Sequence, residues 1–245
     1  MWTVTIGKVL ELISNNQEIV EVDLSGLDFS DVSLAQGKFY YVNFSGCRFK
    51  DTDLSETNFD ECDFIGARFE GVDFKDIVFN ELNFQKSSFL NSDLSGIMIR
   101  GCSFEGALFE GSKCNSFIVS DSNFSGAIFE KADLNDASFL ECDFKQTTFK
   151  GCNLYKSIFK SCTFEGVGLK KNRVEKTFFD DCDLSKQDFS DTVFSKTHAQ
   201  NCNLSHSNFD GANIEQSFFT GSNLSGCSFR GTKGVSACFM NADIT

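Results

Sequence analysis

Large apolar side chains recur at every fifth position over almost the whole chain. From Leu24 to Ile244 this frame contains 45 positions, of which 27 are Phe, 10 Leu, 3 Ile and 2 Val. The frame never slips over these 220 residues, so any insertion within it has a length that is a multiple of five. A period of five matches neither the 2.0-residue period of a strand nor the 3.6-residue period of a helix. The pattern therefore predicts a solenoid in which each five-residue unit forms one side of a coil.

A second inward position lies two residues before each large one, where the side chain is small or moderately apolar, as in Cys62, Ala67 and Val72. Residues 22–245 contain 32 acidic and 21 basic residues, and none of them occupies either of these two positions. With 53 charges that could have violated the frame, the division into two inward and three outward residues per unit is well determined. Cys114 and Phe117 exchange the large and small side chains, which conserves the volume inside the coil.

The units resemble those of the pentapeptide repeat family, in which a small residue, Asp or Asn, Leu or Phe, a polar residue and often Gly follow one another. Residues 222–226, Ser-Asn-Leu-Ser-Gly, and Ala132-Asp133-Leu134 carry the resemblance, which covers about nine tenths of the chain. It implies an all-β solenoid, a right-handed quadrilateral β-helix with four sides and hence twenty residues per coil. At ~4.8 Å per coil, about 11 coils would make a rod on the order of 53 Å long.

Residues 1–21 precede the array and are expected to form an N-terminal cap, whereas residues 22–245 form the β-helix. Ile6, Val9, Leu10 and Ile13 follow the i, i+3, i+4, i+7 spacing of a short amphipathic helix that would cover the first coil. Two segments depart from the repeat. Residues 168–176 place polar Asn172 inward among four basic residues, which predicts a distorted corner, and residues 232–235 lack a large inward side chain, which predicts looser packing.

The overall charge restricts the partners of the chain. With 22 basic and 35 acidic residues the net charge is -13, which argues against direct binding to nucleic acid or to an anionic membrane and favours basic protein partners. No apolar run has the length of a membrane span, and the N-terminus shows no signal peptide, so we expect a cytoplasmic protein.

Cysteine usage points to a reducing compartment. Nine of the eleven cysteines occupy the small inward position, and six share one register of twenty residues, namely 62, 102, 142, 162, 182 and 202. A metal or redox ladder is one interpretation, but no His accompanies the thiols, and buried cysteines usually pack as small apolar residues. We expect them to be packing residues, with no metal and no cofactor.

No arrangement of residues indicates catalysis. His198 and His206 fall at outward positions, and no Cys/His, Ser/His/Asp or Gly-rich phosphate motif occurs in a context that would position it. A rod with a filled core also offers no deep pocket. We therefore expect no catalytic residues and a protein that is not an enzyme.

Two surface features remain. Residues 23–136 carry 20 acids and 9 bases, a net charge of -11, whereas residues 137–245 carry 12 of each; the acidic half is either functional or only solubilising. Stacking outward residues modulo twenty also gives one apolar line, with Tyr40, Tyr41 and Met240 nearby. An exposed apolar line reduces solubility and suggests a covered surface, unless local twist turns some of these residues inward. The candidate interface consists of Val78, Met98, Ile118, Leu140, Ile158, Phe178 and Phe218.

These observations favour a non-catalytic protein-binding scaffold, with a homodimer through the apolar line as one alternative. The resemblance implies another, because some family members are acidic, Phe-rich DNA mimics that modulate type II topoisomerases, DNA gyrase or topoisomerase IV, and confer fluoroquinolone resistance. Residues 141–144, Glu-Cys-Asp-Phe, are similar to that subgroup, but its C-terminal helical dimer module and frame-breaking loops are not evident. A third hypothesis is a rigid module of a larger bacterial or effector protein.

Overall fold

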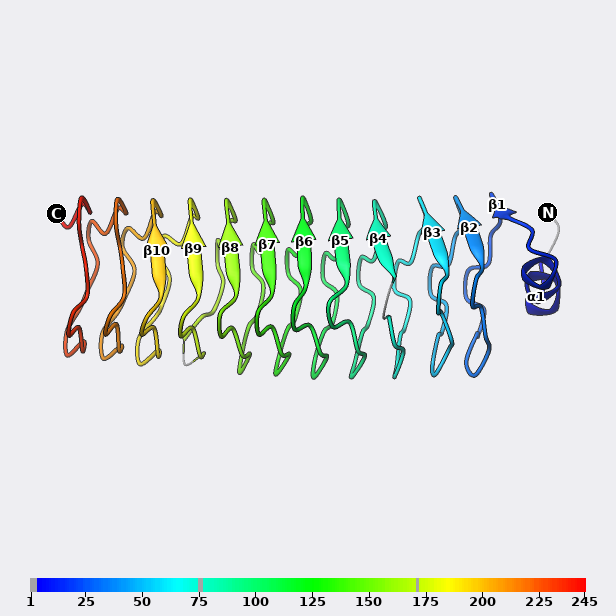
Figure 1. Cartoon of the computed structure of the whole chain (residues 1–245), viewed down its shortest axis with the longest axis horizontal. Helices are drawn as coiled ribbons and strands as arrows, with labels where there is room; N and C mark the ends of the chain where they lie inside the picture. The colour runs from blue at the N-terminus through cyan, green and yellow to red at the C-terminus, as the bar shows by residue number, and fades with distance from the viewer. Residues whose placement is uncertain (1–3, 75–76, 171) are drawn as a thin grey trace.

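The computed structural model shows a straight rod of stacked coils with one short helix at its N-terminal end (Figure 1). It describes residues 4–74, 77–170 and 172–245. Backbone bridges join residues twenty apart at four positions per coil, for example Asp23 with Asn43, Asp28 with Arg48, Ser33 with Asp53 and Ile19 with Phe39. All are parallel, as a right-handed quadrilateral β-helix requires, so the predicted fold is confirmed.

One of the four sides carries regular strands. They pair in parallel as one sheet of β1 to β3 and a second sheet of β4 to β10. Residues 22–245 make about eleven twenty-residue coils, and strands β2 to β10 mark nine of them. The strands are β1 (Ile19–Val20), β2 (Lys38–Tyr40), β3 (Asn58–Asp60), β4 (Val78–Asn80), β5 (Met98–Arg100), β6 (Ile118–Ser120), β7 (Ser138–Leu140), β8 (Ile158–Lys160), β9 (Phe178–Asp180) and β10 (His198–Gln200).

The core consists of columns of phenylalanine rings that run along the rod. Phe104, Phe124 and Phe144 stack with ring centroids 4.9 and 5.3 Å apart. Rings of different columns meet at steep angles, as Phe124 and Phe139 do at 89°. Both arrangements are favourable for aromatic quadrupoles. The exchanged residues Cys114 and Phe117 are both fully buried, as predicted.

Each corner of the coil is a turn with one residue in the left-handed region. The corner residues are those at every fifth position from Glu21 to Asn241. All of them that the structure describes have a positive φ, and 28 of them are not glycine. In most turns the next residue donates its N–H to the carbonyl three residues back, as Ala127 does to Phe124 at 2.9 Å. This is the geometry of a type II turn, whose third residue needs φ > 0. The turn therefore explains why Gly is frequent in the repeat, and each non-glycine residue costs roughly 1–2 kcal/mol there.

Hydroxyl and thiol groups at the small inward position donate hydrogen bonds to the backbone. Thr147 Oγ1 donates to the carbonyl of Phe124 at 2.7 Å, and Cys182 Sγ lies 3.3 Å from the carbonyl of Phe159, in each case 23 residues earlier. These contacts link successive coils and give buried polar groups a partner. The cysteines are all free. They pack as expected, and their thiols also contribute hydrogen bonds that the sequence analysis did not anticipate.

Helix α1 (Ile6–Ser14) covers the first coil, as predicted. Thr5 caps its N-terminus by accepting from the N–H of Lys8 at 3.3 Å, and Val9 is fully buried against the core. The expected apolar face is partly wrong, because Leu10 is exposed and Leu12 packs against the core instead.

The two irregular segments keep the twenty-residue register. Bridges Thr148 to Gly168 and Asn153 to Arg173 flank the predicted distortion, while its corner residue, Lys171, lies outside the described residues. Asn172 is buried as expected, and its Oδ1 accepts from the N–H of Gly151 at 2.9 Å.

In the last coil, Thr232 Oγ1 still donates to the carbonyl of Phe209 at 2.7 Å. Thr232 is only half-buried, however, and Gly234 is exposed, so the second irregular segment is less covered than the matching positions of earlier coils.

Candidate functional surface

The seven residues predicted as an interface all lie on the strand-bearing side of the rod. Six of them are at the first position of a coil's strand side, where the ladder pairs Val78 with Met98 and Met98 with Ile118, and Leu140 ends strand β7. Their side chains are exposed, from 38% at Phe218 to 57% at Ile118, so none of the seven is turned into the core. We call this set, Val78, Met98, Ile118, Leu140, Ile158, Phe178 and Phe218, the apolar wall.

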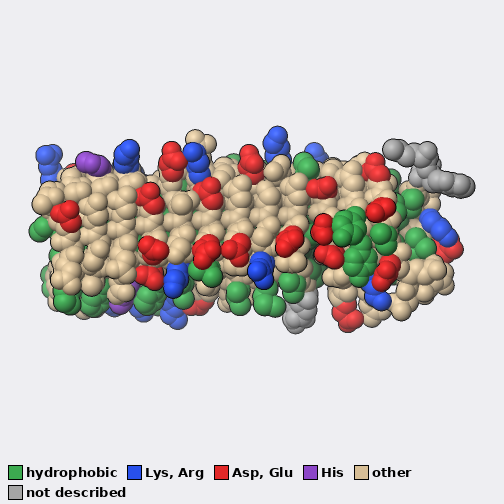
Figure 2. All heavy atoms as spheres, turned by 90° about the horizontal axis from the view of Figure 1, so that it is seen from above, with side chains coloured by type: hydrophobic (Ala, Val, Ile, Leu, Met, Phe, Trp, Pro, Cys, Tyr) green, Lys and Arg blue, Asp and Glu red, His purple; other side chains and the backbone are tan. Residues whose placement is uncertain are grey.

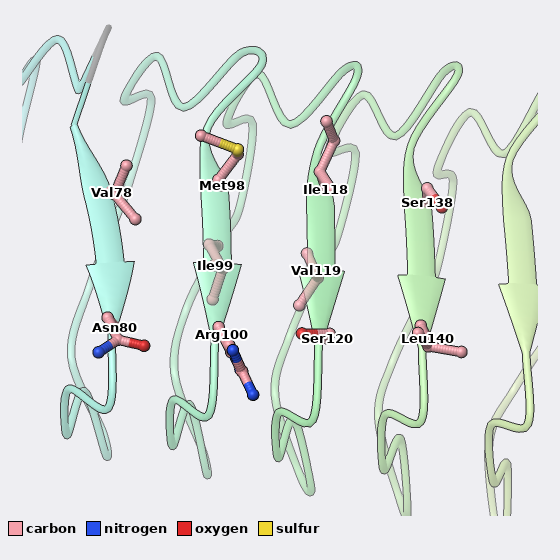
Figure 3. A pocket seen from close by; sticks show the side chains of 10 residues that line it. All are labelled: Val78, Asn80, Met98, Ile99, Arg100, Ile118, Val119, Ser120, Ser138 and Leu140. Atoms are coloured by element: carbon pink, nitrogen blue, oxygen red, sulfur yellow. The ribbon is translucent and has the colours of Figure 1, made fainter.

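Strands β4 to β7 form a shallow groove of about 420 Å³ on this wall. Figure 3 shows its two rows of outward side chains, one at the beginning of the strands and one at their ends. The first row contains Val78, Met98 and Ile118, and Leu140 closes the second row beyond Arg100. The groove is therefore apolar on one flank and mixed on the other.

The wall continues toward the C-terminus as an aromatic stack. His198 lies between Phe178 and Phe218, with ring centroids 4.6 and 4.7 Å away and interplanar angles of 18° and 21°. Partial burial between the two rings lowers the pKa of His198 below its usual 6.5. The outward His198 therefore serves as a flat neutral ring of the wall above that pH.

Acidic side chains line the corner that follows the strands. This row, which we call the acidic ridge, consists of Glu61, Glu81, Asp121, Glu141 and Asp181, all exposed. Figure 2 shows acidic side chains following one another along the rod in this way. Arg100 reaches one of them, with its Nε 3.9 Å from Asp121 Oδ2. The ridge was not among the predicted surface features, although the corner residues show it when they are stacked modulo twenty.

The opposite corner, which precedes the strands, has a different charge in each half of the rod. It carries the exposed acids Glu56 and Asp136 in the N-terminal half and Lys156, Lys176 and Lys196 in the C-terminal half. In the N-terminal half the apolar wall thus has the acidic ridge on one flank, while the other flank carries the neutral Gly96 and Ser116 between these two acids. In the C-terminal half it has carboxylates on one flank and lysines on the other.

The basic residues of the C-terminal half gather around Tyr155. Arg173 Cζ lies 4.5 Å from the centre of its ring, and Lys176 Nζ donates to its hydroxyl at 2.7 Å. This hydrogen bond and the positive charge lower the pKa of Tyr155. The half that is neutral by charge count therefore contains a local basic cluster.

Burial raises the pKa of most of the buried thiols, whereas hydrogen bonds with Cys142 and Cys182 lower the pKa of Cys162. Burial raises the pKa of Cys47 and Cys62 to about 11 and that of Cys102 and Cys152 to about 12, so these groups are protonated at neutral pH. Within the described residues, no group of three or more His, Cys, Asp or Glu side chains could hold a metal ion. In the same part of the chain, no helix is long and apolar enough to cross a membrane.

Several solved structures resemble this chain at low sequence identity. No curated protein sequence matches the chain. Among solved structures, HetL, a regulator of heterocyst differentiation from the cyanobacterium Nostoc, is 16% identical with a TM-score of 0.40, covering 97% of this chain and 98% of its own. QnrB1, a plasmid-mediated fluoroquinolone resistance protein, is also 16% identical with a TM-score of 0.47, covering 89% and 93%. A thylakoid-lumen pentapeptide repeat protein of Arabidopsis thaliana is 24% identical with a TM-score of 0.30, covering 47% and 70%.

The family comparison is carried by the sequence itself. A family model described as a pentapeptide repeat region matches residues 22–99, 122–192 and 152–229, and a second, described as pentapeptide repeats in 8 copies, matches residues 102–139. Proteins of this kind are generally non-catalytic structural folds. The matches cover most of the chain, and the stacked coils have the five-residue repeat that the family models describe. The protein therefore belongs to the pentapeptide repeat family.

Proposed function

We propose that this protein is a non-catalytic scaffold that binds another protein through the apolar wall. The observation that carries the proposal is the alignment of seven exposed apolar side chains on one flat side of the rod. Burying such side chains is favourable by about 25 cal/mol per Å² of apolar area. Contiguous apolar patches of this kind mark interaction sites on soluble proteins.

The geometry of the wall favours a macromolecular partner that contacts side chains. The groove over β4 to β7 is shallow and open along the rod, unlike the deep clefts that enclose small ligands. Backbone groups beside it are already used between coils, as in the bonds from Glu81 N–H to Arg100 and from Ile118 N–H to Ile97. A partner therefore has no free strand edge to extend here, and its affinity must come from side-chain burial.

A photocrosslinking experiment tests this proposal in the cells that express the protein. A photoreactive amino acid replaces Ile118 on the wall or, as a control, Ile128, which is also exposed but lies on the opposite side. We expect a discrete crosslinked protein only from position 118, and we expect Ile158→Asp with Phe178→Asp to weaken it. Equal crosslinking from both positions, or none from position 118, would contradict the proposal.

A second candidate function is mimicry of DNA toward a type II topoisomerase, and the acidic half of the rod favours it. Residues 23–136 carry a net charge of -11 over 23 sides, or about 27 Å, where duplex DNA would carry roughly 16 phosphates. The acidic ridge places part of this charge in one line along the rod. This candidate uses the ridge as its contact surface, whereas the scaffold uses the wall.

A DNA gyrase supercoiling assay at two salt concentrations, with and without a fluoroquinolone, tests this second candidate. Inhibition or drug protection that weakens with salt, and that disappears in Glu81→Lys with Glu141→Lys, would support mimicry because screening and charge reversal both remove the electrostatic attraction. An absence of any effect at protein concentrations well above that of the enzyme would refute it.

A further inference from the structure

We propose that the occupant of the apolar wall over strands β4 to β7 is a basic amphipathic α-helix that lies along the rod. This inference rests on the scaffold function proposed above and specifies the chemistry of its partner. Three observations carry it: the spacing of the apolar side chains, the acidic charge beside the groove, and the poor fit of a second copy of the chain.

The first observation is the distance between successive apolar side chains. Val78, Met98 and Ile118 start neighbouring parallel strands, so they repeat at the strand spacing of ~4.8 Å along the rod. Side chains on one face of an α-helix that are three or four residues apart are separated by about 4.5 or 6 Å along its axis, a mean of about 5.3 Å when the two steps alternate. Same-face side chains of an extended peptide are instead about 6.6–6.8 Å apart. A helix parallel to the rod therefore stays close to the spacing of the three apolar side chains on β4 to β6, and an extended segment does not.

The second observation is the charge beside the groove. Glu61, Glu81, Asp121 and Glu141 lie on the flank that follows the strands, where Arg100 Nε lies 3.9 Å from Asp121 Oδ2. On the other flank, Asp136 precedes β7 and lies 3.9 Å from Lys156 Nζ, and Glu56 lies one coil before the groove. An apolar face with Lys or Arg along one border matches this arrangement, because its cations would oppose the carboxylates of the acidic ridge.

The third observation is that a second copy of the chain fits this segment less well than a basic helix. If two rods packed wall to wall in antiparallel directions, the two acidic ridges would face each other. If they packed in parallel directions, the ridge of one copy would meet Glu56 and Asp136 of the other near Glu61 and Glu141. The antiparallel arrangement opposes carboxylates along the whole ridge, and the parallel one opposes them at these two positions. Each chain also carries a net charge of -13, which opposes association.

Defined peptides test the inference with the full-length protein. The probe is a fluorescent peptide of about 18 residues with Leu on one helical face and Lys at its borders, long enough to form a helix on binding. Two control peptides keep the design but change one feature: Glu replaces every Lys, or Leu is placed at every second residue, which creates an apolar face only in an extended chain. Anisotropy reports affinity, and circular dichroism reports helix formation.

We expect the basic helical peptide to bind with a gain of helicity and to weaken about tenfold or more in Ile118→Asp, which is roughly 1.4 kcal/mol. Glu81→Lys with Glu141→Lys should weaken it similarly and remove most of its salt dependence. The matched control, Glu110→Lys with Glu130→Lys, makes the same charge change on the opposite side and should lower the affinity by less than about threefold.

Equal or tighter binding of the acidic or the extended-pattern peptide would overturn the inference, as would indifference of the basic peptide to the wall variants. The experiments distinguish a wrong partner class from a wrong scaffold function. If no peptide binds but position 118 still crosslinks a discrete protein, the wall binds a partner of another kind. If position 118 also captures nothing, both proposals fail.

Discussion

Removal of a single ring from the middle of the core tests the inward frame directly. Phe124 is fully buried and contacts rings on all sides: Phe104 and Phe144 stack above and below it, while Phe109, Phe129 and Phe139 meet it at centroid distances of 6.2, 5.6 and 6.0 Å. Phe124→Ala leaves a cavity among five rigid neighbours that are themselves held by stacking. Little relaxation can fill it.

The expected loss of stability follows from this environment. Phe→Ala substitutions in cores cost about 3–5 kcal/mol, and the loss is greatest where the cavity cannot collapse. Two stacked partners at 4.9 and 5.3 Å place Phe124 toward the upper end of this range. A domain is usually stable by only about 5–15 kcal/mol, so the variant should remain folded but unfold at much lower denaturant concentration. Phe124→Leu leaves a smaller cavity but also removes both stacked contacts, so its cost should be measurable and smaller than that of Phe124→Ala.

Urea denaturation followed by far-UV circular dichroism measures the effect, with the midpoint and slope giving the free energy of unfolding. Phe178→Ala is the matched control, because it removes the same atoms from a ring that is 43% exposed on the outside of the rod. It should change stability by less than about 1 kcal/mol. An unchanged midpoint for Phe124→Ala, or an equal loss for Phe178→Ala, would show that the assignment of inside and outside is wrong.

Three further predictions concern the corners, the thiols and the wall. Gln146 has a φ of 56°, so Gln146→Gly should raise the free energy of unfolding by about 0.5–1 kcal/mol in calorimetry, and a decrease would contradict the cost assigned to left-handed corners. With a thiol reagent at pH 8, only half-buried Cys227 and Cys238 should react quickly, because burial excludes the reagent and raises the pKa of groups such as Cys102 to about 12; rapid reaction of more than two thiols would refute this. The pKa of His198 lies below its unfolded 6.5, so the unfolded chain binds more protons just below that pH. The contribution of His198 to the free energy of unfolding should be constant above about pH 6.5 and should decrease as the pH falls below it. His198→Phe should abolish this pH dependence, whereas an unchanged dependence would assign it to other groups.

Much of the architecture was predictable because each repeat unit is an independent check of the same assignment of inward and outward positions. Every charged residue of the array falls outside the two inward positions, and this fixed the frame before the fold was known. The exposed row from Val78 to Phe218 follows once outward residues are stacked modulo twenty. Both inferences need only the period and the number of sides per coil.

Other features depend on geometry that the five-residue pattern does not contain. All four sides share the same pattern, so it does not indicate which one forms regular strands. The hydroxyl of Thr147 donates to the carbonyl of Phe124, 23 residues earlier. This offset is one coil of twenty residues plus three more, and the five-residue pattern does not contain it. The helix was misjudged at Leu10 because the face that contacts the coil is rotated about the helix axis toward Leu12.

The unbroken frame also limits how such a rod can change in length. Adding or removing one unit of five would rotate everything that follows by a quarter turn about the rod axis, so that Ile158 and Phe178 would no longer continue the line of Val78 and Met98. Adding twenty residues would lengthen the rod by one coil and leave every face in place. A surface that runs along several coils is therefore preserved only when whole coils of twenty residues are added or removed. Any other change of length would interrupt the apolar wall and the acidic ridge at the same point.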